Sequence, residues 1–210
     1  MPDLIISLDQ VLERVNAFNA SANKRIILGI VGKPGAGKST LAEHILSNLS
    51  EGIATVVPMD GYHLSNSQLA RLGLSDRKGA PNTFDSEGYV NLLRRLKKEI
   101  DKDVYFPVFH REIEESYAAD GVVLANTKIV LTEGNYLLLS EMGWQGIAGE
   151  LDEIWYVDID DDLRLDRLTK RHQKFGKDAS AAYTWARGTD EVNAKIVEAT
   201  AFRADYIIKP

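Results

Sequence analysis

Hydrophobic residues along the chain form two kinds of pattern that alternate with one another. Short apolar runs typical of buried strands lie at 25–31, 54–59, 128–133 and 153–158, and a closing strand is predicted at 206–209. Helical spacing predicts helices over 8–18, 39–49, 86–100, 160–175 and 190–201. This alternation predicts an α/β fold in three layers, a parallel sheet flanked by helices.

Two stretches depart from the alternation. Residues 65–83 are polar and rich in turn-forming residues, which predicts a long connection. Residues 104–109 and 122–124 are predicted to be extended, and three acidic residues between them are interpreted as a solvated face: Glu112, Glu114 and Glu115. With 210 residues, the chain fits a single domain over 1–210.

Composition excludes several classes of function. The net charge is −6, from 25 Lys and Arg against 31 Asp and Glu. Nucleic-acid-binding surfaces are usually basic, so we expect no nucleic-acid partner. The chain has no Cys, which excludes disulfides and thiolate chemistry. It also lacks a signal-like N-terminus and any apolar stretch of about 18 residues, so we expect no membrane contact and a cytoplasmic location.

The segment at 32–39, GKPGAGKS, matches the phosphate-binding pattern G-x-x-x-x-G-K-[ST]. Its glycines let successive backbone N–H groups turn toward an anion, at the positive end of the helix that follows. Lys38 can reach the β- and γ-phosphates, and the Ser39 hydroxyl can bind Mg²⁺. We therefore predict ATP and Mg²⁺ as cofactors, with the nucleotide bound by Gly32, Pro34, Gly35, Ala36, Gly37, Lys38, Ser39 and Thr40.

Other nucleotide-binding classes fit less well. A dinucleotide fingerprint would need Gly where the chain has Thr40, and the string TKIV at 127–130 lacks the Asp of a guanine-reading motif. The preference for ATP over GTP is otherwise left open. Gly32, Asp60 and Glu133 each fall at the end of a predicted strand, where ligands bind in parallel sheets, so we expect them in one pocket.

Three further segments carry a resemblance: VPMDGYHL at 57–64, GAPNTFD at 79–85 and TEGNYLLL at 132–139. With the phosphate loop, they resemble the phosphoribulokinase/uridine kinase family of P-loop kinases. The resemblance is greatest to the bacterial branch labelled nucleoside/nucleotide kinase or fructose-transport-system kinase, and pantothenate kinase is more distant. It covers about residues 25–208 and implies the P-loop nucleoside triphosphate hydrolase fold with a small helical lid at about 160–190. A homodimer is an expectation at the level of the family.

The resemblance implies a role for each carboxylate. Asp60 would accept the proton of the acceptor hydroxyl, and Glu133 would approach the magnesium ion together with Ser39. Two structural alternatives remain open, a capping role for Asp60 and a purely structural one for Glu133. The substrate-binding candidates are His63, Arg77, His110, Arg111 and Tyr136. Phe109 stands where uridine and pantothenate kinases carry a Tyr, so that hydroxyl contact is absent.

A predicted helix near the C-terminus carries four cations on one face, at spacings of three, four and three: Arg164, Arg167, Arg171 and Lys174. In the family such a helix belongs to a lid whose arginines close over the phosphates, which makes Arg167 and Arg171 catalytic candidates. An ordinary solvated face, paired by Asp161 and Asp166, is the alternative. The resemblance also places Asn193 near the nucleotide base.

These observations predict an ATP- and Mg²⁺-dependent kinase that phosphorylates a hydroxyl of a small metabolite. A sugar or a nucleoside fits better than pantothenate, and no run of Arg on the acceptor side suggests a phosphorylated acceptor. A regulatory ATPase or GTPase switch without an acceptor is the main alternative. A binding module with a vestigial loop is a third.

Overall fold

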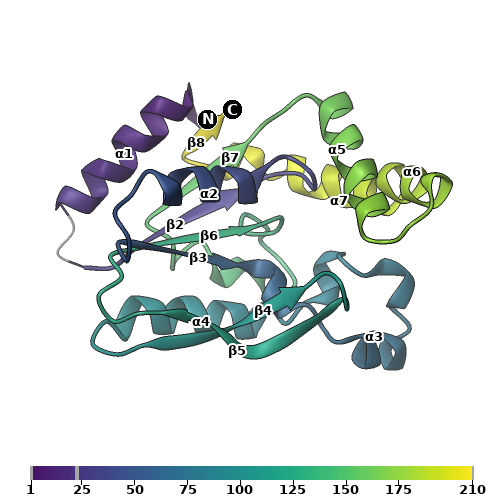
Figure 1. Ribbon diagram of the computed structural model, residues 1–210, viewed down its shortest axis with the longest axis horizontal. Coiled ribbons are helices and arrows are strands. Elements are labelled where there is room, and N and C mark those ends of the chain that lie inside the picture. The colour runs from purple at the N-terminus through teal and green to yellow at the C-terminus, as the bar shows by residue number, and fades with distance from the viewer. Residues whose placement is uncertain (1, 22–23, 210) are drawn as a thin grey trace.

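The computed structural model describes residues 2–21 and 24–209, and its centre is a sheet of six parallel strands (Figure 1). The strand order is β1-β8-β7-β2-β6-β3. The bounds are β1 (Asp3–Ile6), β2 (Ile26–Val31), β3 (Ala54–Pro58), β6 (Ile129–Gly134), β7 (Glu153–Val157) and β8 (Tyr206–Ile208). The predicted α/β fold with a parallel sheet is confirmed, and β1 adds an edge strand that the sequence did not predict.

Helices cover both faces of the sheet. One face packs against α1 (Leu8–Ser21) and α2 (Lys38–Ser47), and the other packs against α4 (Ser86–Lys98) and α7 (Thr189–Glu198). Figure 1 shows α5 (Asp161–Lys174) and α6 (Ala179–Arg187) together at one end, with α3 (Asn66–Leu72) below them. Within residues 2–21 and 24–209, no helix combines the length and the apolar character that a membrane crossing requires.

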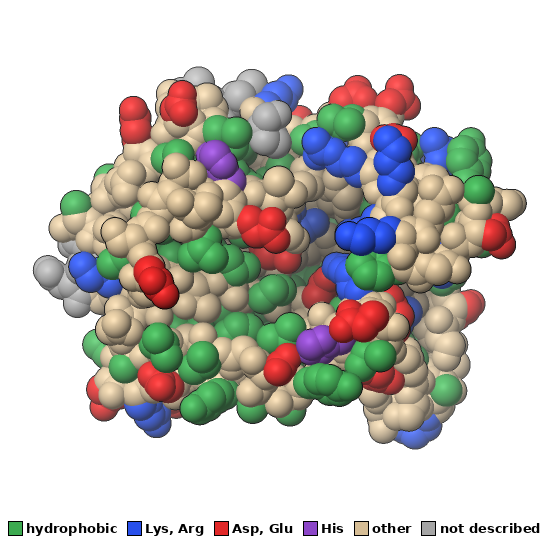
Figure 2. Space-filling view, in the orientation of Figure 1, with side chains coloured by type: hydrophobic (Ala, Val, Ile, Leu, Met, Phe, Trp, Pro, Cys, Tyr) green, Lys and Arg blue, Asp and Glu red, His purple; other side chains and the backbone are tan. Residues whose placement is uncertain are grey.

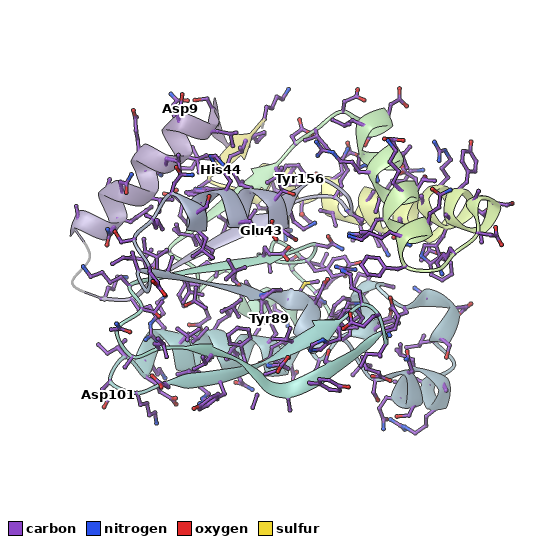
Figure 3. The ribbon with its side chains drawn as sticks, viewed as in Figure 1. Asp9, Glu43, His44, Tyr89, Asp101 and Tyr156 are labelled. Carbon is purple, nitrogen blue, oxygen red and sulfur yellow. The ribbon has the colours of Figure 1, made fainter. Side chains whose placement is uncertain are left out.

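The strand β2 shows why the sheet lies buried between two cores. All six of its residues are buried, and their side chains alternate between the two faces. Leu28 and Ile30 pack with α1 and α2, whereas Ile27 and Val31 pack with α4. Tyr89 of α4 lies in the second core and hydrogen-bonds the Thr132 hydroxyl of β6 (Figure 3). A strand covered on both faces reads as a continuous apolar run, which is why the sequence predicted these strands well.

A β-hairpin and two short helices also differ from the sequence prediction. Residues 104–123 form an antiparallel hairpin of β4 (Val104–His110) and β5 (Glu115–Val123), in place of two short extended segments. The middle of β5, YAAD at 117–120, is exposed and contains no large aliphatic residue, so it carries little hydrophobic signal. The helices α3 and α6 are short, and Ser65 and Asp178 cap their N-termini. Each contains few large apolar residues, so its periodicity was weak.

Arg25 connects the sheet to its surroundings at the end opposite the phosphate loop. Its side chain is buried, and its guanidinium donates hydrogen bonds to five backbone carbonyls. These carbonyls belong to Leu96, Glu99, Leu124, Ala125 and Thr127, which lie at the end of α4 and in the connection from β5 to β6.

We expect Arg25→Met to destabilise the protein by about 3 kcal/mol or more, because each buried carbonyl left without a donor costs about 1–3 kcal/mol. For a protein of this size that corresponds to a fall in Tm of roughly 6–12 °C. Arg95→Met is the matched control, since the exposed Arg95 makes an i,i+4 ion pair with Glu99. Its effect should stay within about 0.5 kcal/mol. Equal Tm values for the two variants would contradict the role given to Arg25.

Candidate functional site

A polar cleft of about 370 Å³ opens at the carboxyl ends of β2, β3 and β6. Its lining includes the following residues predicted as functional: Pro34, Lys38, Ser39, Asp60, His63, Arg111, Glu133, Arg171 and Asn193. Figure 2 shows the hollow, with Lys and Arg side chains gathered on the wall beside α5 and α6. Residues far apart in the sequence therefore meet at the sheet edge where ligands bind in this class of fold.

The phosphate loop runs from the end of β2 to the start of α2. Gly35 and Gly37 adopt φ angles of 82° and 92°, a region that favours glycine, so this turn depends on both. The Lys38 side chain folds back over the loop. Its Nζ donates to Gly32 O at 3.0 Å, to Lys33 O at 3.2 Å and to Asn135 Oδ1 at 2.7 Å. A cation held by neutral oxygens beside a helix N-terminus is suited to bind phosphate oxygens.

Burial lowers the pKa of Lys38 to about 8, against the opposing effect of Glu133. The charged form that binds phosphate is therefore present below pH 8 and is lost as the pH rises through this value. We expect the Kd for Mg·ATP to rise by up to about tenfold per pH unit above pH 8. Trp185 lines the cleft, so its fluorescence can report binding. A Kd that stays constant to pH 9.5, in protein that remains folded, would contradict this assignment.

Two carboxylates lie side by side at the floor of the cleft. Pro58 of β3 pairs with Glu133 of β6, and Asp60 follows two residues after Pro58 in a 3-10 helix. Glu133 Oε1 accepts a hydrogen bond from Ser39 Oγ at 3.1 Å, and Asp60 Oδ2 accepts one from Arg111 Nη2 at 2.6 Å. The two acids thus face different parts of the cleft, one the phosphate loop and the other the β4–β5 hairpin.

Their surroundings shift the two carboxyl groups in opposite directions. Burial raises the pKa of Glu133, and the neighbouring charge of Asp60 adds to this effect. Burial also opposes ionisation of Asp60, but the neighbouring cations Arg111 and Lys38 outweigh it and lower the pKa of that group. Asp60 is therefore an ionised acceptor at neutral pH, and Glu133 is the acid whose charge a bound cation would stabilise.

His63 lines the side of the cleft where we predict that the acceptor binds. Its ring lies between Phe84 and Phe109, with ring centroids 4.0 Å and 4.5 Å away. Its Nδ1 lies 2.8 Å from the Asp60 carbonyl oxygen, and because a carbonyl only accepts, Nδ1 carries the proton. Burial lowers the pKa of His63, which keeps the ring neutral and leaves Nε2 as a hydrogen-bond acceptor.

Lys78 closes the outer rim of the acceptor side. Its Nζ donates to Asn66 Oδ1 at 2.7 Å and to the Glu114 backbone carbonyl, and it lies 3.5 Å from the Glu114 carboxylate. Glu114 is exposed, as predicted for a solvated face, and it also lines the cleft. The rim therefore joins the hairpin to the segment at 65–83, which was predicted only as a connection.

The four cations of α5 do not share one environment. Arg164 is 1% exposed and belongs to an ion-pair cluster outside the cleft, although helical spacing places it on the same face as the others. Arg171 lines the cleft, where burial and the charge of Arg111 lower its pKa. Arg167 lies over the phosphate loop, with its Nη1 3.3 Å from the position that a Cβ on Gly37 would take. Lys174 is exposed and near the Phe175 ring.

Three predicted substrate-binding residues lie outside the cleft lining as the structure describes it. Arg77 is exposed on a short 3-10 helix, and the next residue, Lys78, points into the cleft instead. His110 turns along the hairpin, with Nε2 2.8 Å from Asp120 Oδ2. Tyr136 is buried and donates its hydroxyl to the Gly79 carbonyl, so it positions the wall of the site.

The structure also brings in residues to which the sequence gave no role. Asn135 holds Lys38, although it lies within the TEGNYLLL segment and could have been noted there. His172 lies 2.6 Å from Asp190, and both line the cleft. Asn193, which the sequence placed near the nucleotide base, lines the cleft and donates to Gly79 O at 3.3 Å, a contact to the 65–83 segment that was not predicted. No sequence signal linked these distant positions.

The residues of the cleft fit Mg²⁺ and a nucleoside triphosphate. The two left-handed glycines form a cradle for an anion, and the Ser39 hydroxyl with the Glu133 carboxylate provides two oxygen ligands. In the described part of the chain, no group of three or more His, Cys, Asp or Glu residues could hold a metal ion by itself. That agrees with Mg²⁺, which is usually held by one or two protein oxygens together with phosphates and water.

Comparison with known proteins finds similar sequences and similar structures over most of the chain. A Schizosaccharomyces pombe protein named "Putative uridine kinase C227.14" is 30% identical over 196 residues, which covers 89% of this chain and 83% of that protein. The crystal structure of a "putative fructose transport system kinase" from Silicibacter sp. TM1040 is 34% identical with a TM-score of 0.87, covering 96% of this chain and 98% of that one. YFH7 of Saccharomyces cerevisiae, at 19% identity and a TM-score of 0.81, shares the fold over 98% of this chain and 99% of its own.

The family comparison agrees with these matches and with the cleft. Residues 27–209 match the Phosphoribulokinase / Uridine kinase family, a span that includes the phosphate loop, both carboxylates and helices α5, α6 and α7. The relatives above are named as kinases, and the phosphate loop of this chain has the geometry that binding of a nucleoside triphosphate requires. This chain therefore belongs to the phosphoribulokinase/uridine kinase family of P-loop kinases.

Proposed function

We propose that the protein transfers the γ-phosphate of Mg·ATP to a hydroxyl group of a small, unphosphorylated metabolite, a sugar or a nucleoside. One observation carries the proposal. The ionised Asp60 carboxylate lies in the same cleft as the phosphate-loop residues Lys38 and Ser39, next to the aromatic rings of the acceptor side. A base between a phosphate-binding loop and an acceptor pocket is the arrangement that phosphoryl transfer to a hydroxyl needs.

On the nucleotide side, the residues of the loop and the lid bind charge. Lys38 exchanges its contacts with the Gly32 and Lys33 carbonyls for phosphate oxygens. Ser39 and Glu133 hold Mg²⁺, which when bound neutralises negative charge on the β- and γ-phosphates. Arg167 and Arg171 contact the phosphates from α5, and the segment at 160–190 acts as the lid that excludes water.

On the acceptor side, Asp60 orients the attacking hydroxyl. The bond between the hydroxyl oxygen and the γ-phosphorus forms while the bond from that phosphorus to the oxygen of ADP breaks, and the hydroxyl proton passes to Asp60. A carboxylate with a lowered pKa is sufficient here, because charge builds up little on the nucleophile in a loose transition state. Arg111 holds Asp60 in place through the 2.6 Å hydrogen bond.

The chemistry of the acceptor pocket supports a neutral, hydroxylated substrate. Phe84, His63 and Phe109 provide ring surfaces, and His63 Nε2 is available to accept from a hydroxyl. The two cations there already contact protein oxygens, Lys78 with Asn66 and Glu114 and Arg111 with Asp60. A phosphate group on the acceptor would have to displace these contacts. The names of the relatives above supply one acceptor of each class, fructose and uridine.

The test is ADP release from Mg·ATP across a panel of sugars, nucleosides, glycerate and pantothenate, with Asp60→Asn as the inactive comparison and Asp76→Asn as the matched control. Asp76 is an exposed carboxylate near the acceptor side. We expect one acceptor to raise turnover far above the background, with Asp76→Asn unaffected. Release that no acceptor increases, and that is equal in wild type and Asp60→Asn, would contradict the proposal and favour a regulatory nucleotide switch.

A further inference from the structure

Behind the phosphate loop, two cations are buried away from the cleft and pair with carboxylates nearer the surface. Lys33, the second residue of the loop, is 4% exposed, and Arg164 of α5 is 1% exposed. Lys33 Nζ lies 2.7 Å from Asp161 Oδ1 and 3.8 Å from Glu198 Oε1. Neither Lys33 nor Arg164 belongs to the cleft lining as the structure describes it, so they do not touch the reacting groups directly.

Arg164 connects this group to α7. Its Nε donates to the same Asp161 oxygen at 2.8 Å, its Nη2 donates to Glu191 Oε2 at 2.5 Å, and its Nη1 is 3.5 Å from the Pro34 carbonyl. The hydrogen bonds from Lys33 and Arg164 lower the pKa of Asp161, which keeps it charged. We call the five residues the loop–lid cluster: Lys33, Asp161, Arg164, Glu191 and Glu198.

Backbone packing reinforces this connection. A Cβ on Gly35 would lie 2.7 Å from Leu168 Cγ and 2.9 Å from the Arg164 carbonyl oxygen, so the loop contacts the first two turns of α5 without space between them. Arg167 lies over Gly37, and Arg171 enters the cleft one turn later. The cations of the cluster are buried, but the Asp161 and Glu198 side chains are 54% and 62% exposed. These ion pairs are weak evidence for stability, because solvent screens the exposed carboxylates and desolvation of the cations offsets much of the attraction. The effect of the cluster on geometry is the stronger explanation.

We propose that the loop–lid cluster is a positioning device, which fixes the first two turns of α5 against the phosphate loop and thereby places Arg167 and Arg171 at the phosphate end of the cleft. The proposal rests on the proposed function, in which these two arginines contact the phosphates. It also changes the expected extent of the lid. Residues 160–168 are anchored to the loop, and closure takes place beyond them, in the segment that includes Gly176 with its φ of 96°.

The first variant is Lys33→Met, which keeps the aliphatic stem and removes the charge. We expect kcat to fall about 10- to 100-fold, because a small displacement of positioned groups costs about this much. The KM for the acceptor should stay the same, since the acceptor side lies across the cleft. Lys170→Met is the matched control, because Lys170 pairs with Asp166 on the same helix but both are solvent-exposed. Lys33→Arg should restore most of the activity.

A double-mutant cycle separates positioning from simple stability. If Lys33 acts through the lid arginine, Lys33→Met should cost much less in an Arg171→Ala background than in wild type, although the two residues are not in contact. Additive effects on kcat, or a kcat for Lys33→Met equal to that of wild type, would overturn the proposal. Asp161→Asn, with Asp166→Asn as its control, repeats the cycle with a substitution of the same shape should Lys33→Met fold poorly.

The same cycle is measured on the Kd for Mg·ATP by Trp185 fluorescence, which needs no acceptor. Weaker binding in Lys33→Met, with the loss reduced in the Arg171→Ala background, supports the cluster even if no acceptor is found. Additive losses in Kd argue against it even if transfer is demonstrated. Failure of the proposed acceptor chemistry and failure of the positioning role are therefore distinguishable.

Discussion

Replacing Asp60 by Asn is expected to lower kcat by about 100- to 10,000-fold, the range typical for removal of a positioned general base. The amide keeps the shape of the side chain and can still contact the acceptor, but it cannot take the hydroxyl proton. Asp60 is separate from the Ser39–Glu133 contact at the phosphate loop. The affinity for Mg·ATP should therefore be retained, and it should increase slightly because a negative charge near the phosphates is lost.

The measurement is kcat with the acceptor found in the panel, together with the Kd for Mg·ATP in the absence of acceptor. Asp76→Asn controls for the loss of an exposed carboxylate nearby. An Asp60→Asn enzyme with the turnover of wild type would mean that another group accepts the proton or that Asp60 is only structural. A loss confined to the Kd for Mg·ATP would instead assign Asp60 to the nucleotide.

Replacing Lys38 by Ala is expected to reduce kcat/KM for Mg·ATP by at least about 1,000-fold. Removal of a single neutral donor at a site of developing charge costs about 100- to 1,000-fold, and Lys38 provides a full charge. The change also leaves Asn135 Oδ1 and two loop carbonyls without their donor, which disturbs the loop itself. Both effects act on the phosphates rather than on the acceptor.

Asn135→Ala is the informative companion variant, since it removes the side chain that holds Lys38 but keeps the cation. We expect a loss between that of Lys38→Ala and wild type, with a thermal melt to establish that each variant is folded. Substantial transfer by Lys38→Ala would show that the lid arginines alone neutralise the phosphates. Equal losses for both variants would show that orientation of Lys38 matters as much as its charge.

Three groups of residues have different roles in the proposed function. We propose that Lys38 and Ser39 bind the phosphates from the loop, that Asp60 acts on the acceptor, and that α5 supplies arginines whose position depends on buried cations outside the cleft. This division explains why Arg164 differs from the neighbouring cations of α5. Its guanidinium is engaged by Asp161 and Glu191, so its charge serves the arrangement of the helices rather than the phosphates.

The sheet core and the phosphate loop can be predicted from the sequence alone, because each depends on constraints within a short segment of the chain. Strands buried on both faces must be continuously apolar, and a loop that binds an anion through its backbone needs glycine where φ is positive, as at Gly35 and Gly37. The ends of β2, β3 and β6 then had to meet at one edge, which brought Asp60 and Glu133 together as predicted from the alternation of strands and helices.

Which polar residues face the cleft depends on how separate segments of the chain pack together. Arg77 and Lys78 are adjacent in the sequence, yet Lys78 is the one that Asn66 and Glu114 hold at the rim. The helical spacing placed Arg164 with the other cations of α5, but packing of α5 on the loop and on α7 buried it. Such outcomes depend on contacts between separate segments of the chain, and no local pattern of polar and apolar positions encodes them.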